Sequence, residues 1–245
     1  MRTLVFGHRG ASGYAPENTL EAFRLAAEMG AEGVELDVHL TRDGELAVAH
    51  DERVERVSNG VGRICDMTLK ELKKLHFNAI HPEYEGAQLP TLKEVYELLK
   101  PYGLLINVEI KNGVYPYPGI EEKCLELAAE EGMEEKILYS SFNHYSMMRV
   151  KKLKPDAKCG LLYDCCLINP WDYAHSIGVD ALHPSFPELS MVPDECDKAH
   201  ALGLTVNTWT VNDERDMRMC VDAGADIIIT NYPDRGRAFI DGYTK

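Results

Sequence analysis

Two carboxylates lie two residues apart in an apolar stretch near the start of the chain. Glu35 and Asp37 belong to GVELDVHL, which predicts a strand over residues 33–40. Side chains two apart in a strand point to the same side. Two buried carboxylates on one side would repel each other and lose hydration, and a bound cation removes both costs. Because carboxylate oxygens suit hard cations better than zinc, the pair predicts one divalent metal ion: Mg²⁺, Ca²⁺ or Mn²⁺.

A second pair with the same spacing follows further along the chain. Glu109 and Lys111 lie in NVEIK, at the end of a strand predicted over 104–110. Glu109 would complete the set of metal-binding carboxylates, and Lys111 would add a positive charge on the same side. For one such pair alone, the alternative interpretation is that the side chains lie at the rim of the fold and are solvated by water. Two such pairs on successive strands favour the metal site.

Histidines and an arginine follow two other apolar runs. His8 and Arg9 come directly after a strand predicted over 3–7, and His50, followed by Asp51, ends the segment LAVAHD. A histidine can serve as a general acid or base because its unperturbed pKa lies near 6.5. The alternative is a structural histidine with its hydrogen bonds satisfied. We adopt that interpretation for the histidines whose segments contain no partner residues: His39, His76, His81, His144, His175 and His200.

The elements that must position these residues alternate between short apolar runs and amphipathic helical patterns. Further strands are predicted over 136–141, 158–163, 181–184, 205–210 and 226–230, and helices over 18–29, 91–100, 120–131, 144–154, 170–177, 193–201 and 214–224, with a short one at the end. Thr91 and Glu94 have the spacing of a capping box. About eight strand–helix units in 245 residues favour a closed TIM (β/α)₈ barrel over the alternative, an open doubly wound sheet.

One stretch interrupts the alternation of strands and helices. Residues 51–89 contain Gly60 and Gly62, a helix-like MTLKELKKL and a polar HPEYEGAQ turn. We interpret them as an insertion on the barrel rim that is too small for an independent core. The chain is therefore predicted to form a single catalytic domain over residues 1–245.

The composition limits the partners and the cellular compartment. A formal net charge of −14 disfavours nucleic acid and stable association with anionic membranes. No apolar stretch approaches the roughly 18 residues needed to span a bilayer. The opening residues MRTLVFGHRG do not resemble a secretory signal, and the seven scattered cysteines fit reduced thiols, so we expect a cytoplasmic protein. The sequence leaves open whether the chain forms a homo-oligomer.

Taken together, these motifs resemble those of the glycerophosphodiester phosphodiesterase family, and most of all its bacterial cytoplasmic members. The similarity begins with HRGASGYAPENTLEAF (8–23) and continues through GVELDVHLTRDGELAVAHD (33–51) and NVEIK (107–111). It extends weakly to ALHP, which contains His183, and to NTWTVN around Trp209. The first two motifs are long and specific, and the matched segments span nearly the whole chain.

The resemblance implies a TIM barrel that uses a divalent metal to hydrolyse glycerophosphodiesters, such as glycerophosphocholine or glycerophosphoethanolamine, to glycerol 3-phosphate and an alcohol. It implies that His8 and His50 form the catalytic acid–base pair and that Glu35, Asp37 and Glu109 bind the metal. It also implies that Arg9 and Lys111 contact the phosphate and that Trp209 covers the glycerol part of the substrate. Glu17 and Asn18 would support these residues, and His183 is a weaker candidate for the site. Two alternatives are a phosphodiesterase for lysophospholipids and a non-catalytic barrel that binds a phosphorylated ligand. All the matched histidines and carboxylates are present, which weighs against the second.

Overall fold

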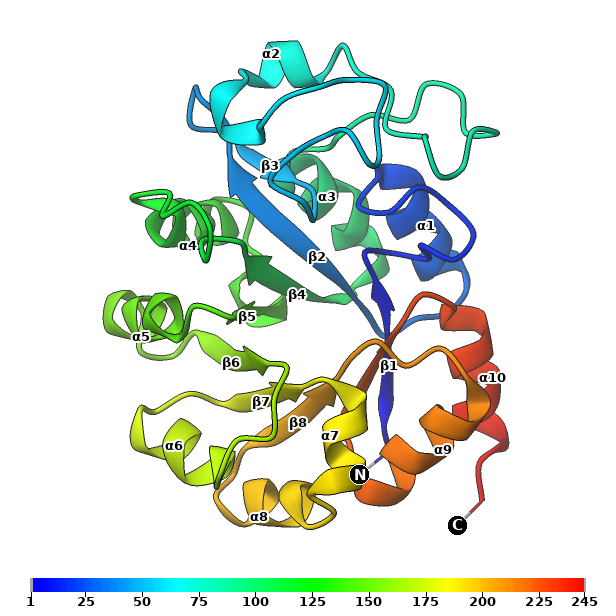
Figure 1. The fold of residues 1–245 in the computed structure, drawn as a ribbon, viewed down its shortest axis with the longest axis vertical. Helices are drawn as coiled ribbons and strands as arrows, with labels where there is room; N and C mark the ends of the chain where they lie inside the picture. The colour runs from blue at the N-terminus through cyan, green and yellow to red at the C-terminus, as the bar shows by residue number, and fades with distance from the viewer. Residues whose placement is uncertain (1, 245) are drawn as a thin grey trace.

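The strands of the chain close into a barrel, as the computed structural model of residues 2–244 shows (Figure 1). Within these residues, eight parallel strands follow one another around the ring, and β9 returns to pair with β1. The strands of the ring are β1 (Leu4–His8), β2 (Gly33–Leu40), β4 (Leu105–Ile110), β5 (Ile137–Ser141), β6 (Lys158–Tyr163), β7 (Ala181–Pro184), β8 (Thr205–Thr208) and β9 (Ile227–Thr230). The predicted TIM barrel is confirmed.

Helices surround this ring on the outside, where they cover the apolar outer faces of the strands (Figure 1). The α-helices are α1 (Leu20–Glu28), α2 (Leu69–Leu72), α3 (Leu92–Leu99), α4 (Ile120–Glu130), α5 (His144–Leu153), α6 (Pro170–Ser176), α7 (Phe186–Met191), α8 (Glu195–Ala201), α9 (Glu214–Ala223) and α10 (Pro233–Gly242). Three short 3₁₀ helices lie at Ile64–Asp66, Lys100–Tyr102 and Glu134–Lys136. Among the described residues, no helix combines the length and the apolar composition that crossing a membrane requires.

The α3 helix begins where its sequence predicts. The Thr91 hydroxyl accepts a hydrogen bond from the Glu94 amide, and the Glu94 carboxylate accepts one from the Thr91 amide at 2.7 Å. This reciprocal pair satisfies two amide groups that a helix start leaves without intrahelical partners.

Two elements were not predicted. The strand β3 (Leu46–Val48) pairs antiparallel with β2 through a tight turn in which the Thr41 amide donates to the Glu45 carbonyl. Its three residues are too few to show a periodicity, so their pairing depends on the neighbouring strand. The helix α7 precedes α8, where a single helix over 193–201 was predicted. It is also short, and tertiary contacts rather than local propensity determine short helices.

The insertion carries a small hydrophobic cluster of its own beside the main core. Seven buried residues form it, and two of them come from β3 or directly after it: Ala47, Ala49, Val54, Ile64, Leu72, Phe77 and Leu89. The predicted helix MTLKELKKL is reduced to α2, which begins at a capping box of Thr68 and Glu71. The segment lies at the top of Figure 1, beside β3 and the end of β2, with α2 at its edge.

The turn from β1 into α1 has a left-handed backbone. Arg9 has a φ of 55° and Gly10 a φ of 83°. This conformation presses the turn against α1, and the Ala11 amide donates to the Ala22 carbonyl at 2.9 Å. A Cβ atom on Gly10 would lie 2.6–2.7 Å from backbone and side-chain atoms of Ala22. The close approach therefore requires a glycine directly after His8 and Arg9.

We expect Gly10→Ala to lower the free energy of unfolding more than Gly86→Ala does. Both glycines have a φ of 83°, but apart from its two chain neighbours no part of residues 2–244 lies within 4 Å of a Cβ at Gly86. The two variants share the cost of a left-handed alanine, about 1–2 kcal/mol. The overpacking at Gly10 adds about 1–3 kcal/mol. Urea unfolding of the two variants measures the difference, and equal values would contradict the close packing of this turn.

Candidate active site

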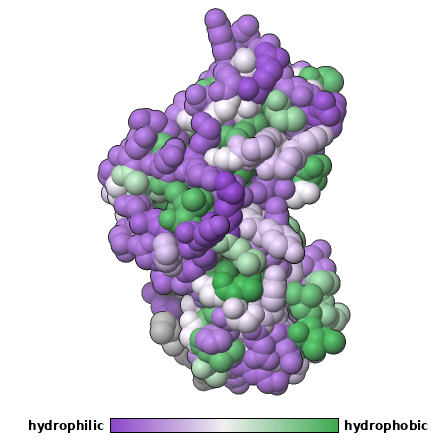
Figure 2. All heavy atoms as spheres, turned by 90° about the vertical axis from the view of Figure 1, so that its left-hand side faces the viewer, coloured by the Kyte–Doolittle hydropathy of each residue, from purple (hydrophilic) through white to green (hydrophobic). Residues whose placement is uncertain are grey.

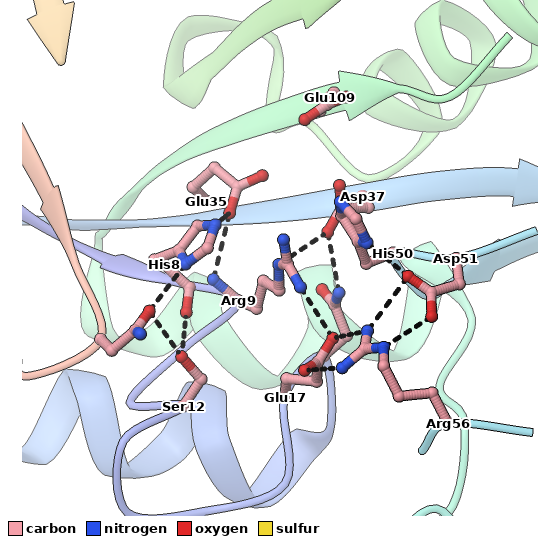
Figure 3. A network of polar contacts seen from close by, with 12 residues as sticks. His8, Arg9, Ser12, Glu17, Glu35, Asp37, His50, Asp51, Arg56 and Glu109 are labelled. Atoms are coloured by element: carbon pink, nitrogen blue, oxygen red, sulfur yellow. Dashed lines mark hydrogen bonds and ion pairs between the residues drawn. The ribbon is translucent and has the colours of Figure 1, made fainter. Parts of the chain in front are cut away.

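Three carboxylates meet at the carboxyl-terminal mouth of the barrel (Figure 3). Glu35 and Asp37 come from β2, and Glu109 comes from the neighbouring β4, where it stands in register with Asp37. Each residue offers an oxygen within 4.8 Å of the other two, and all three residues are buried. The two-residue spacing in β2 thus has the outcome that strand geometry predicts, with both side chains on the inner face.

The electrostatics of these carboxylates are those of a cation site. Burial, followed by the charges of Asp37 and Glu109, raises the pKa of Glu35 well above its usual value. Burial and Asp37 likewise raise the pKa of Glu109 to about 7. At Asp37 burial opposes ionisation, but Arg9 and Lys111 outweigh it and lower the pKa. The cluster therefore gathers more negative charge than its own cations neutralise.

The residues fit one divalent metal ion. The Oδ1 atom of Asp37 is buried and has no hydrogen-bond donor within residues 2–244, which leaves its lone pairs available. Three carboxylates offer the hard oxygen donors that Mg²⁺, Ca²⁺ and Mn²⁺ accept. Buried charges in proteins are either paired with opposite charges or bound to metals. The three carboxylates have too few neighbouring cations to be fully paired, so they suit a metal.

Two cations border the carboxylates. The Nζ atom of Lys111 lies 2.9 Å from Glu109 and 3.7 Å from Asp37. The guanidinium of Arg9 lies 2.9 Å from Glu17 and 3.6 Å from Asp37. The backbone amide of Arg9 donates to Glu35 at 3.1 Å, so the β1–α1 turn is tied directly to β2. Both predicted phosphate contacts thus stand beside the acidic cluster.

His8 ends β1 with both ring nitrogens near polar atoms. Its Nδ1 lies 2.7 Å from Oδ1 of Asn231, and its Nε2 lies 3.9 Å from Glu35. Because a carboxamide oxygen only accepts, Nδ1 carries the proton and Nε2 keeps a free lone pair. Burial, followed by the charge of Arg9, lowers the pKa of His8 to about 4. The imidazole is therefore neutral at physiological pH.

His50 stands across the site from His8 and has a carboxylate partner. Its Nδ1 lies 2.6 Å from Asp51, the residue that follows it. Burial opposes ionisation of Asp51, but hydrogen bonds from Arg56 and His50 lower its pKa to about 2. A permanent negative charge therefore sits behind the His50 ring. His39 contacts the backbone of His50: its Nε2 lies 3.2 Å from the His50 carbonyl oxygen.

A cavity of about 50 Å³ joins these residues to an apolar wall. Trp209 and Phe142 lie on that wall, with their rings edge to face at 5.6 Å. The indole nitrogen of Trp209 donates to the His183 carbonyl at 2.9 Å. The His183 ring is fully buried, contacts Asn207 and fills the space that a Cβ on Gly160 would need. The structure therefore brings Trp209 to the site but turns the ring of His183 into the barrel interior.

Four residues of the site were missed in the sequence. Asn231 follows β9 and holds His8, and Asn107 and Phe142 line the cavity. Arg56 reaches the site from the insertion and bonds both Glu17 and Asp51. Of these, only Asn107 had a usable signal, since it lies two residues before Glu109 on the same strand face.

Comparison with known proteins identifies the family. The profile of the glycerophosphoryl diester phosphodiesterase family matches residues 8–235. The chain is 46% identical to a glycerophosphodiester phosphodiesterase of Caldanaerobacter subterraneus subsp. tengcongensis, with 96% of each chain covered. The chain belongs to this family. Membership in the glycerophosphoryl diester phosphodiesterase family makes it a phosphoric diester hydrolase.

Solved structures of the family share the architecture. A phosphodiesterase from Oleispira antarctica, solved in complex with the product sn-glycerol-3-phosphate, superposes with a TM-score of 0.86 at 30% identity and 98% coverage of both chains. A glycerophosphodiester phosphodiesterase from Thermotoga maritima superposes with a TM-score of 0.79 at 29% identity, covering 97% of this chain and 98% of its own. The phosphodiesterase barrel is thus matched over nearly its full length.

We expect the affinity of this phosphodiesterase for a divalent cation to fall by about tenfold or more between pH 8 and pH 6. A cation binds the ionised carboxylates, and a Glu109 with a pKa of about 7 must lose its proton to bind below that pH. Titration calorimetry with Mg²⁺, Ca²⁺ and Mn²⁺ measures the dependence. Glu109→Gln should bind more weakly at pH 8, and an affinity independent of pH would contradict the arrangement.

Proposed function

We propose that the chain hydrolyses glycerophosphodiesters, such as glycerophosphocholine or glycerophosphoethanolamine, to glycerol 3-phosphate and an alcohol, with a divalent metal ion and two histidines. One observation carries the proposal: two histidines, Arg9 and two buried carboxylates, Glu35 and Glu109, line one cavity at the barrel mouth (Figure 3). Asp37 completes the carboxylate cluster, and Lys111 lies beside it. The relative from Oleispira antarctica, solved with sn-glycerol-3-phosphate, supports a small-molecule substrate of this type.

The first task of such a site is to bind a phosphate anion beside three carboxylates. Arg9 and Lys111 offer positive charge at the edge of the cluster, and Arg9 can bind two phosphate oxygens with its planar fork. A divalent ion held by Glu35, Asp37 and Glu109 would supply Lewis-acid stabilisation of the developing phosphoryl charge. Mg²⁺, Ca²⁺ and Mn²⁺ all suit this donor set.

The hydrogen bonds of the two histidines support different roles for them. The free Nε2 of the neutral His8 can accept a proton from a substrate hydroxyl. Nδ1 of His50 is held by the Asp51 carboxylate, which orients the ring so that its other nitrogen can give a proton to a leaving oxygen. His8 is thus the base and His50 the acid of the first step.

The reaction then proceeds in two steps. The hydroxyl on glycerol C2 gives its proton to His8 and attacks phosphorus, the bond from phosphorus to the alcohol oxygen breaks, and His50 protonates that oxygen. This leaves a cyclic phosphate. In the second step His50 accepts a proton from water, the water oxygen attacks phosphorus, the bond from phosphorus to the C2 oxygen breaks, and His8 returns its proton to that oxygen. The product is glycerol 3-phosphate, and both histidines regain their starting states.

The remaining surroundings fit a small polar substrate in a reduced compartment. Trp209 and Phe142 would cover the carbon skeleton of the glycerol. The net charge of −14 disfavours nucleic acid and anionic membranes as partners. The seven cysteines, all within the described residues, are free thiols, which fits the proposed cytoplasmic location.

One observation favours a second substrate class, the lysophospholipids. Phe142, which lines the cavity, is 46% exposed, and large apolar side chains at Ile168 and Met191 are also exposed. Figure 2 shows hydrophobic side chains gathered at the lower right of the molecule, below a hollow in its outline. An acyl chain could lie on such a surface, because burying it there removes apolar area from water.

Substitution of either histidine should remove most of the activity. We expect His8→Ala and His50→Ala each to lower kcat about 10²- to 10⁴-fold, since each loses one proton transfer. Release of glycerol 3-phosphate from glycerophosphocholine measures the effect, with EDTA and metal add-back. His175→Ala, on the exposed face of α6, is the matched control. Undiminished metal-dependent hydrolysis by His8→Ala would reject the catalytic assignment.

The two substrate classes are separated by one comparison. We expect glycerophosphocholine to be turned over with a higher kcat/KM than lysophosphatidylcholine below its micellar concentration. Phe142→Ala should then affect the two substrates alike, because Phe142 touches only the glycerol part. A larger loss with lysophosphatidylcholine would instead show that the exposed apolar surface binds an acyl chain.

A further inference from the structure

Arg56 is the point where the insertion reaches the active site. It follows His50 in the chain and lies outside the strands of the barrel, and its guanidinium makes four hydrogen bonds to two carboxylates (Figure 3). Toward Asp51, Nε donates at 2.6 Å and Nη2 at 3.1 Å. Toward Glu17, Nη1 donates at 2.7 Å and Nη2 at 2.8 Å. Paired contacts of this kind fix the orientation of a carboxylate as well as its position.

Each of the two carboxylates that bind Arg56 also contacts a residue with a proposed role in the reaction. Asp51 accepts from His50 at 2.6 Å, and Glu17 accepts from Arg9 at 2.9 Å. Arg9 in turn lies 3.6 Å from Asp37 in the acidic cluster. The polar chain therefore runs from the acid of the first step, through Arg56, to the phosphate contact.

Charge alternates along this chain, and Arg56 is the positive centre between two negative groups. Burial opposes ionisation of Glu17, but hydrogen bonds and charge from Arg56 and Arg9 lower its pKa. Loss of Arg56 would remove the positive charge that lies between Glu17 and Asp51. Each carboxylate could then turn away, and the His50 and Arg9 side chains would lose a fixed partner.

We propose that Arg56 is a positioning residue that couples the orientation of His50 to that of Arg9. The inference rests on the proposed roles of these two residues. It gives the insertion a function in catalysis, although none of the insertion residues 51–89 lines the cavity. A second contact supports this: His81, also in the insertion, lies 3.3 Å from the Ser12 carbonyl, and the Ser12 hydroxyl lies 2.7 Å from the His8 carbonyl.

The test is Arg56→Ala, assayed with glycerophosphocholine and saturating metal. We expect kcat to fall about 10- to 100-fold, as for other residues that orient active-site groups. KM should change less, because misorientation of His50 acts mainly in the transition state. Guanidinium chloride at a non-denaturing concentration should restore part of kcat, because guanidinium can bind both carboxylates. Arg56→Lys should retain intermediate activity, since lysine keeps the charge but not the fork.

The matched control is Arg53→Ala. Arg53 lies in the same segment and is paired with Glu55, outside the chain that leads to His50 and Arg9. It should keep its kcat and show no response to guanidinium. Wild-type kcat in Arg56→Ala would overturn the inference. So would a loss that neither guanidinium nor lysine relieves, because a purely structural role would behave in that way.

Failure of this inference is distinguishable from failure of the proposed function. If His50→Ala is inactive while Arg56→Ala is fully active, only the coupling is wrong. If His50→Ala keeps full activity, the proposed mechanism itself is wrong, and the coupling falls with it. Circular dichroism and the melting temperature of each variant identify a folding defect, and Arg56→Lys, which retains the charge, then provides the decisive comparison.

Discussion

The burial of three carboxylates at one end of the barrel is the constraint on which the rest of the site depends. Glu35, Asp37 and Glu109 lose most of their hydration and repel one another at short range. Such an arrangement persists only if positive charge is brought to it. The cations around the cluster, the turn that carries one of them and the suitability of the site for a divalent metal ion all follow from this requirement.

The charge of the carboxylate cluster is balanced by residues of alternating charge that extend outward from it. Lys111 and Arg9 flank the carboxylates, Glu17 binds the far side of Arg9, and Arg56 binds Glu17. The inner charges are screened little by solvent, whereas Arg56 is 42% exposed and its pairs are weaker. The outer shell therefore contributes orientation more than stability. Arg56, a residue of the barrel rim, can in this way affect the orientation of side chains at the barrel mouth.

Closure of the barrel supplies the second half of the site. Because β9 pairs with β1, the residue after β9 lies against the residue that ends β1, and Asn231 reaches His8. The bond sets which nitrogen of His8 carries the proton. Arg9 and His8, the proposed phosphate contact and base, thus stand on consecutive residues but are held by different parts of the fold. Arg9 is held by Glu17, which Arg56 of the insertion binds, and His8 is held by Asn231 after the last strand.

The features that depend on local periodicity were predictable from the sequence alone. The two-residue spacing of Glu35 and Asp37 predicts their common face, and the capping box at Thr91 predicts the start of α3. The motif from His8 to Phe23 carries the resemblance to the family that the comparisons confirm. These features are readable because strands and helices repeat their geometry every few residues.

The three-dimensional arrangement of the barrel determines which distant residues complete the site. Asn231 lies 223 positions from the histidine it orients, and Arg56 lies 39 positions from Glu17. It also decided that the ring of His183 faces the barrel interior and that a three-residue run becomes β3. Hydrogen-bond partners in loops follow from how the barrel closes and where the insertion packs, and no local pattern encodes either. The candidate metal-binding residues were therefore predictable from the strand sequences, whereas the orientation of the site side chains depends on contacts between distant parts of the fold.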